Sequence, residues 1–203
     1  VQGLMAGINA SLYVQGETPL ILKRSDAYIG VLIDDLVTKG TAEPYRMFTS
    51  RAEYRLHLRE DNAGLRLREK GYEVGLVKEE DYRIFLEKRR TIEKTLLKIS
   101  NTKINPTNEN NEIIHRWGSA SLKKEASLQE LLKRPEIHYQ HLFAFDRDLE
   151  SLSKQGWEQV EIQVKYDGYV KRQMEQIDRF KRLEDVSFPE GFDFRSVIGL
   201  STE

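Results

Sequence analysis

The sequence contains no cysteine, which excludes disulfides, thiolate nucleophiles, iron–sulfur clusters and cysteine-based zinc sites. This absence fits a reducing compartment, and we expect a cytoplasmic protein. No apolar run approaches the roughly 20 residues that a membrane-spanning helix needs. The first ten residues also lack the positive charges that begin a secretory signal peptide. The sequence therefore predicts a soluble protein with no membrane partner.

The chain also has almost no net charge. Its 32 lysines and arginines nearly balance 33 aspartates and glutamates, which leaves −1 over 203 residues. Any case for nucleic acid must therefore come from local clustering of charge. This length allows at most two compact units. Because the chain starts without methionine and on an apolar segment, we expect it to begin inside a larger protein.

Three segments of the first half show the apolar spacing and capping signals of helices, namely residues 3–15, 25–38 and 61–72. The first is rich in glycine and alanine, which predicts a buried helix. Ser25 or Asp26 is expected to cap the second helix, and Gly40 to end it. Residues 44–59 are predicted as a short helix opened by Ser50, followed by a short extended segment.

The second half reads as helical. Residues 79–99 have helix spacing, residues 101–111 are predicted as a surface loop, and short helices follow over 112–117 and 127–132. A long amphipathic helix is predicted over 157–183, with the apolar face Ile162, Tyr166, Tyr169, Gln173, Ile177 and Phe180. The predicted fold is mainly α, with one unit over residues 1–75 and a helical bundle over residues 76–203.

Arginines and aromatic residues are concentrated in one block, made of Arg46, Arg51, Arg55, Arg59, Arg66 and Arg68 with Tyr45, Phe48 and Tyr54. Guanidinium groups hold phosphates, and aromatic faces stack on bases. If helical, Arg51, Arg55 and Arg59 form a basic stripe with steps of about 6 Å, close to phosphate spacing. The alternative is that the block pairs with its own carboxylates, Glu43, Glu53, Glu60, Asp61 and Glu69. Both interpretations stay open at this point.

Other polar groups give weaker signals. Adjacent Asp34 and Asp35 point about 100° apart on a helix, so we expect them not to face one site but to form salt bridges or caps. His138 and His141 lack a third ligand of suitable spacing, so no metal site is predicted. Gly168 is expected to mark close packing of another backbone. No G-x-G-x-x-G motif is present, so no complete dinucleotide site is predicted.

Five stretches in a fixed order resemble the carboxy-terminal part of the GidA/MnmG flavoproteins. They are Ile29 to Leu67, Gly-Leu-Met-Ala-Gly-Ile-Asn-Ala at 3–10, Arg-Pro-Glu at 134–136, Val-Glu-Ile-Gln-Val-Lys-Tyr-Asp-Gly-Tyr at 160–169, and Phe192 to Glu203. Two departures are clear. Gly64 stands where the family commonly has aspartate, and the chain stops before the family's final helical segment.

The resemblance implies a homodimeric enzyme with an amino-terminal FAD domain of the Rossmann type and a GTPase partner, MnmE. It places residues 1–75, with the arginine-rich block that faces tRNA, at the carboxy-terminal end of that flavin-binding α/β domain, and residues 76–203 in a helical domain. Such enzymes use methylene-tetrahydrofolate, an amine donor, FAD and NADH. They place a carboxymethylaminomethyl or aminomethyl group on carbon 5 of the wobble uridine of certain tRNAs. The family's catalytic cysteines lie upstream of the region matched here. We therefore expect this chain alone to hold no catalytic residue, to bind no cofactor and to be inactive.

The resemblance also assigns three sets of candidate residues. The predicted tRNA-binding residues are Arg46, Arg51, Arg55, Arg59, Arg66, Tyr45 and Tyr54, and those near the flavin are Gly3, Gly7 and Asn9. Partner-binding residues are expected on the long helix at Tyr166, Tyr169 and Arg172. The alternative function is a non-catalytic protein-interaction module whose arginines only form salt bridges. The related folate-dependent tRNA uracil methyltransferase fits less well, because it lacks the long helical extension.

Overall fold

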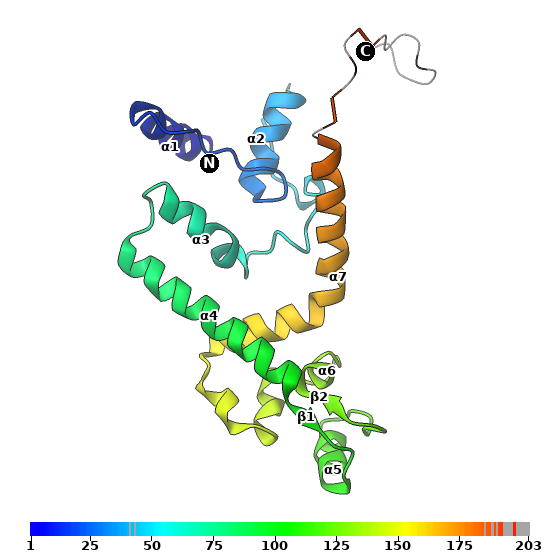
Figure 1. Cartoon of the computed structure of the whole chain (residues 1–203). Coiled ribbons are helices and arrows are strands. Elements are labelled where there is room, and N and C mark those ends of the chain that lie inside the picture. The colour runs from blue at the N-terminus through cyan, green and yellow to red at the C-terminus, as the bar shows by residue number, and fades with distance from the viewer. Residues whose placement is uncertain are drawn as a thin grey trace.

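The structure is a computed structural model that describes residues 1–40, 42, 44–184, 186–187, 189, 191–192 and 197. Glu43 and nearly all of the stretch from Phe192 to Glu203 lie outside these residues. The chain is mainly helical (Figure 1), which confirms the predicted fold class. The α-helices are α1 (Gln2–Val14), α2 (Tyr28–Thr38), α3 (Ala63–Glu73), α4 (Glu79–Asn101), α5 (Asn108–Arg116), α6 (Leu128–Leu132) and α7 (Lys154–Glu184).

Short elements connect these helices. Three 3-10 helices lie at η1 (Thr49–Arg51), η2 (Tyr139–Ala144) and η3 (Arg147–Ser151). Strands β1 (Lys103–Ile104) and β2 (Ala126–Ser127) pair antiparallel, with Lys103 opposite Ser127. None of the helices in the described ranges is long and apolar enough to cross a membrane.

The larger core lies where α4, α6 and the first half of α7 meet, in the lower part of Figure 1. Its members include Ile99, Leu128 and Val160, which are fully buried. Tyr139 is also buried there, and its hydroxyl donates to the Leu149 carbonyl at 3.2 Å. This hydrogen bond lets a large polar-tipped ring lie in an apolar interior at low cost.

A smaller core joins the two ends of the chain. Val31 from α2, Ala52, Tyr54 and Leu58 from the following segment, and Ile177 from α7 are buried together. Helix α7 therefore packs against the larger core with its first half and against the α2 region with its second half.

Some helix boundaries follow directly from the local sequence. The Ser127 hydroxyl accepts from the Glu130 amide at 3.1 Å, and the Glu130 carboxylate accepts from the Ser127 amide at 2.7 Å, which is the predicted capping box. Gly40 follows the last residues of α2 with a φ of +64°, which confirms it as the end of that helix. Gly30, inside α2, has no room for a side chain, because an added Cβ would lie 2.1 Å from the Lys23 carbonyl oxygen.

The prediction of a buried first helix is wrong for this chain. In α1 only Met5 and Ile8 are buried, whereas Leu4 is 51% and Tyr13 84% exposed. Among the described residues, no atom from outside the helix's own backbone lies within 4 Å of a Cβ added at Gly3 or Gly7, so no other described backbone approaches these glycines. The small residues shape an open surface, which composition alone does not distinguish from a tight contact.

Several local predictions in the first half also differ from the structure. Helix α2 begins after Ala27, because the Asp26 carboxylate accepts from the Lys23 amide and closes a turn instead of capping the helix. Residues 55–57 form turns, and residues 55–59 form no strand. The short helix of this region is η1, with Ser50 inside it.

In the second half, several local predictions are wrong. Helix α5 starts at Asn108 and not at residue 112, because the Thr107 hydroxyl accepts from the Asn110 amide, and β1 occupies part of the predicted loop. The buried side of α7 contains Val160 and Val164 with Ile177, whereas Tyr166, Tyr169 and Phe180 of the predicted face are exposed. An added Cβ at Gly168 meets no atom within 4 Å, so no other backbone packs there.

Candidate nucleic-acid interface

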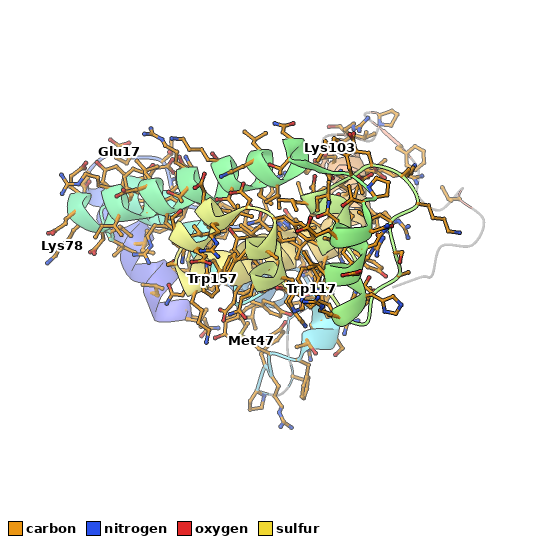
Figure 2. The ribbon with its side chains drawn as sticks, turned by 90° about the horizontal axis from the view of Figure 1, so that it is seen from below. Glu17, Met47, Lys78, Lys103, Trp117 and Trp157 are labelled. Atoms are coloured by element: carbon orange, nitrogen blue, oxygen red, sulfur yellow. The ribbon has the colours of Figure 1, made fainter. Side chains whose placement is uncertain are left out.

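The arginine segment, residues 44–62, connects α2 with α3 and runs beside the second half of α7 (Figure 1). The part around Met47 projects away from the helices (Figure 2). The rest of the segment is anchored, since Tyr54 and Leu58 lie in the smaller core with Ile177. The segment thus has one fixed part and one part that extends outward.

Two glutamines of α7 fix the backbone of the arginine segment. The Gln173 side chain accepts from the His57 amide at 2.9 Å, and the Gln159 side chain donates to the Asp61 carbonyl at 2.9 Å. These hydrogen bonds satisfy backbone groups that belong to no helix or strand. Helix α7 therefore determines where the arginines of this segment lie.

Asp35 is the buried anion beneath the arginine segment, with a side chain only 3% exposed. Its carboxylate accepts from Arg24 at 2.7 Å, from the Tyr45 hydroxyl at 2.6 Å and from Lys39 at 3.0 Å. Burial alone would raise the pKa of Asp35, but these hydrogen bonds outweigh it and hold the pKa well below its ordinary value. The carboxylate is therefore charged at neutral pH.

Arg24 joins α2 to the arginine segment. It contacts Asp34 at 2.8 Å, Asp35 at 2.7 Å and Glu53 at 2.6 Å, and it donates to the Arg51 carbonyl at 3.1 Å. Burial would lower the pKa of Arg24, but the three carboxylates raise it above its ordinary value. The expectation that Asp34 and Asp35 cannot face one site is wrong, because a single guanidinium reaches both. Their predicted salt-bridge role is confirmed.

Arg24 was missed by sequence reasoning because it lies outside the arginine block and follows no periodic pattern with it. The available signal was the Asp34–Asp35 pair itself. Two adjacent carboxylates on a helix that also contributes to a core need a nearby cation. The pair therefore indicates that a cation is close by, but it does not show that this cation is Arg24.

Three arginines of the segment direct their charge outward. The Arg51 guanidinium lies 4.4 Å from the centre of the Tyr45 ring and 3.9 Å from Asp35, and its side chain is 40% exposed. Arg46 lies 5.1 Å from the centre of the Phe48 ring, and both residues are exposed. Arg55 is exposed and forms no hydrogen bond or ion pair with any residue that the structure describes. These three side chains keep donors available for an anion.

Arg59 and Arg66 instead hold the segment together. Arg59 contacts Asp61 at 2.9 Å and donates to the Leu56 carbonyl. Arg66 donates to the Asn62 side chain at 2.8 Å and to the Asp26 carbonyl. Burial and the nearby charge of Arg59 lower the pKa of Arg66. These donors are engaged within the chain, unlike those of the outward arginines.

The helical stripe predicted for Arg51, Arg55 and Arg59 is wrong, because Arg51 ends a 3-10 helix, Arg55 lies in a turn and Arg59 lies in an irregular stretch. Of the carboxylates considered as partners, Asp61 pairs with Arg59, Glu53 with Arg24 and Glu69 with Arg89. Self-pairing therefore describes Arg59, and it does not account for Arg46 or Arg55.

The two tyrosines predicted to contact RNA have structural positions. Tyr54 is only 9% exposed and belongs to the smaller core, so its ring cannot stack on a base without unpacking that core. Tyr45 is half-buried and donates its hydroxyl to Asp35. Burial and this hydrogen bond raise the pKa of Tyr45, which stays protonated. Tyr45 thus orients Arg51 through its ring.

The residues predicted near a flavin lie on α1. Gly3 and Gly7 line a groove of about 830 Å³ between α1 and the end of α3, whose charged lining residues are Glu17 and Glu73. Asn9 does not face a ligand: its amide donates to the Leu20 carbonyl at 3.1 Å and accepts from the Leu20 amide at 2.7 Å. A groove with only acidic charge does not fit the diphosphate of a dinucleotide.

The residues predicted to bind a partner are exposed on α7. Tyr166 is 40% and Tyr169 58% exposed, with ring centres 6.3 Å apart. Arg59 lies 5.6 Å from the centre of the Tyr166 ring. Arg172 is exposed and makes no ion pair within the described part of the chain.

The two histidines of the bundle have ordinary structural contacts. His138 lies 2.8 Å from the Glu161 carboxylate, and the His141 ring stacks on Trp117 with centres 4.6 Å apart. No group of three or more metal-ligating side chains occurs in the ranges that the structure covers.

Comparison with known proteins identifies the family. Residues 79–174 match the family model described as the tRNA modifying enzyme MnmG/GidA C-terminal helical domain. The chain is 54% identical over 202 residues to a tRNA uridine 5-carboxymethylaminomethyl modification enzyme MnmG of Clostridium novyi, and 53% identical over 203 residues to that of Enterococcus faecalis. Each match covers 100% of this chain and 32% of the relative, so the chain spans about a third of their length.

A solved structure agrees with these matches. The structure of Aquifex aeolicus GidA in its form II crystal superposes with a TM-score of 0.76 at 37% identity, over 99% of this chain and 31% of that one. The chain therefore belongs to the MnmG/GidA family of tRNA-modifying enzymes, and it includes the family's C-terminal helical domain.

Proposed function

We propose that this chain supplies tRNA binding and partner binding to an enzyme that modifies the wobble uridine of certain tRNAs. The whole protein would act as a homodimer with the GTPase MnmE, and with FAD and NADH it would add a carboxymethylaminomethyl or aminomethyl group to carbon 5. The names of the relatives, which are tRNA uridine 5-carboxymethylaminomethyl modification enzymes, support the substrate class.

The main support for tRNA binding is the exposure of Arg46, Arg51 and Arg55 on one segment. Phosphate contacts dominate the affinity of proteins for nucleic acids, and arginine is suited to them by its fixed fork of donors. We therefore assign phosphate contact to these three arginines. Arg59 and Arg66 shape the segment and contribute indirectly.

The described residues do not fit FAD, because the groove at α1 has acidic charges and the Asn9 amide is already paired. FAD and NADH would therefore be bound mainly by residues other than these. This chain's own proposed contribution is to hold and orient the RNA.

A titration of tRNA binding against salt tests this function. The logarithm of the affinity should fall steeply with the logarithm of salt, and Arg46→Gln, Arg51→Gln and Arg55→Gln should each reduce the slope by about one unit. Arg147→Gln is the matched control, since Arg147 is exposed on η3 and has no partner among the described residues. A salt-independent affinity, or an equal effect of the control, would contradict the proposal.

A second function, docking of the GTPase partner, is favoured by the exposed apolar side chains of α7. Tyr169 is 58%, Phe180 54% and Leu183 57% exposed on this helix. Tyr169→Ser and Arg172→Gln should weaken association with the GTPase in a calorimetric titration and leave tRNA affinity unchanged. If instead partner binding persists in both variants and tRNA binding is absent, neither assigned surface is correct.

A further inference from the structure

A pocket of about 400 Å³ lies between the arginine segment and α7, and it also reaches α3, α4 and α6. Its volume falls in the usual range for small-ligand sites, roughly 300–1,000 Å³. His57, Arg59 and Asn62 form the side contributed by the arginine segment, and Val170 and Met174 belong to the side formed by α7. The pocket therefore shares the arginine segment with the proposed RNA-binding surface.

Three polar side chains that line this pocket have no protein partner. The His57 ring and the amides of Gln129 and Gln163 are partly buried, and none forms a hydrogen bond with another residue in the described ranges. Partly buried polar groups normally find a partner in protein, water or ligand. Three such groups from three different elements therefore mark a place where an external polar edge can be recognised.

The state of His57 favours a neutral ligand edge. Burial, together with the charges of Arg66 and Arg59, lowers the pKa of His57. The ring is therefore uncharged near neutral pH and offers one donor and one acceptor. Each amide likewise offers both a donor and an acceptor, so this set complements a group with alternating donors and acceptors.

The cations of the pocket argue against a simple anion site. Arg59 is paired with Asp61 at 2.9 Å, Arg66 donates to Asn62 at 2.8 Å, and Lys171 contacts Asp167 at 3.1 Å. An incoming anion would have to displace these contacts. The pocket also has an apolar wall, which is made of Leu65, Leu96, Val164, Val170 and Met174.

We infer that this pocket binds an unpaired nucleobase of the RNA held by the arginine segment. A base has apolar faces and a polar edge, which match the apolar wall and the unpartnered amides and imidazole. Its phosphate would lie toward the outward arginines, which are part of the same segment. The inference rests on the proposed tRNA binding and adds recognition of a base to it.

The test compares two RNAs that bear the same number of phosphates, a stem-loop with unpaired loop bases and the same stem-loop with abasic loop positions. Binding to the full chain is measured by fluorescence anisotropy. The intact loop should bind about tenfold more tightly, within the range observed for single base contacts. Val170→Trp, which fills the pocket, and Gln163→Ala, which removes a polar group without adding bulk, should both reduce this ratio toward one and leave the salt slope unchanged.

The control is Val14→Trp, because Val14 is 85% exposed on α1, outside the pocket. It should preserve the tenfold ratio. If both pocket variants keep the ratio, or if the abasic loop binds as tightly as the intact loop to the unmodified chain, base recognition in this pocket is wrong while phosphate binding stands. If neither RNA binds, the proposed tRNA function fails together with the pocket.

Discussion

At the scale of single residues, a buried carboxylate organises the candidate site. Asp35 binds Arg24, Lys39 and the Tyr45 hydroxyl, and the Tyr45 ring lies under Arg51. An arginine that binds phosphate is more effective when its position is fixed in advance, since less side-chain entropy is lost on binding. In the proposed RNA-binding role, Asp35 would therefore position Arg51 without touching RNA.

The first prediction concerns the charge of Asp35. Asp35→Asn should lower the free energy of unfolding by about 2–3 kcal/mol, because it leaves Arg24 and Lys39 with a weaker partner in a buried position. Asp34→Asn is the control: its side chain is 43% exposed and binds the same arginine, so the loss should stay below about 1 kcal/mol. Urea denaturation followed by circular dichroism measures both. Equal losses would contradict the role of burial.

The second prediction concerns pH. Because the folded pKa of Asp35 is lower than its unfolded value, its charge stabilises the fold above the unfolded pKa, and this stabilisation is lost as pH falls toward the folded pKa. The difference in unfolding free energy between the unmodified chain and Asp35→Asn should be constant above about pH 5 and shrink below about pH 4. A difference that grows as the pH falls would show that the carboxylate is not stabilised by these contacts.

The sequence shows which residues form the arginine block. It does not show which of these side chains are free to contact an external phosphate. Arg55 and Arg59 share the same spacing pattern, yet one is exposed and the other pairs with Asp61. The difference comes from the turn at residues 53–59, which is fixed by contacts with α7. Tyr54 is buried in the smaller core because the same turn packs it against Ile177 of α7. Contacts between distant segments leave no periodic signal.

At the scale of elements, α7 connects the arginine segment to the bundle through its two glutamines. Gln173 accepts from the His57 amide, and Gln159 donates to the Asp61 carbonyl. Both are polar residues on the side of a helix that packs against another segment. The geometry of the arginine segment therefore depends on side chains more than 90 residues away in sequence.

The third prediction tests this connection. Gln173→Leu should destabilise the fold by about 1 kcal/mol, because the part-buried His57 amide loses the Gln173 side chain and keeps only the Tyr54 carbonyl at 3.0 Å as acceptor, and tRNA should bind more weakly as the arginine segment loosens. Gln176→Leu on the same helix is the matched control, since Gln176 is exposed and has no partner in the described chain. Denaturant titration and filter binding report the two effects. Identical behaviour of the two variants would exclude a positioning role for Gln173.

Some helix ends were predicted correctly, whereas the starts of α2 and α5 and the buried face of α7 were not. The Ser127–Glu130 capping box and Gly40 act through neighbouring residues, so the local sequence contains all the required information. The buried side of α7 depends on two different cores along its length, with Val160 in one and Ile177 in the other. The sequence analysis assumed one continuous apolar face along the whole helix. That assumption wrongly placed the exposed residues Tyr166 and Tyr169 on the buried side.

At the scale of the whole molecule, apolar burial is unevenly distributed. The larger core contains fifteen buried residues among those described, the smaller core five, and α1 contributes only Met5 and Ile8. Local unfolding free energy rises with the number of buried apolar contacts. The arginine segment and α2 should therefore open more readily than the bundle, although α7 belongs to both.

The last prediction is that backbone amides in these regions exchange hydrogen at different rates. Amides of α6 and the second half of α4 should exchange slowest, those of α2 faster, and those of α1 fastest. Leu58→Ala, which creates a cavity in the smaller core at a cost of about 2–5 kcal/mol, should lower protection in α2 and leave α6 nearly unchanged. Leu131→Ala, in the larger core, should lower protection in α4, α6 and the first half of α7. If Leu58→Ala lowers protection equally in α2 and α6, the two cores unfold as one cooperative unit, and the RNA-binding surface has no independent opening.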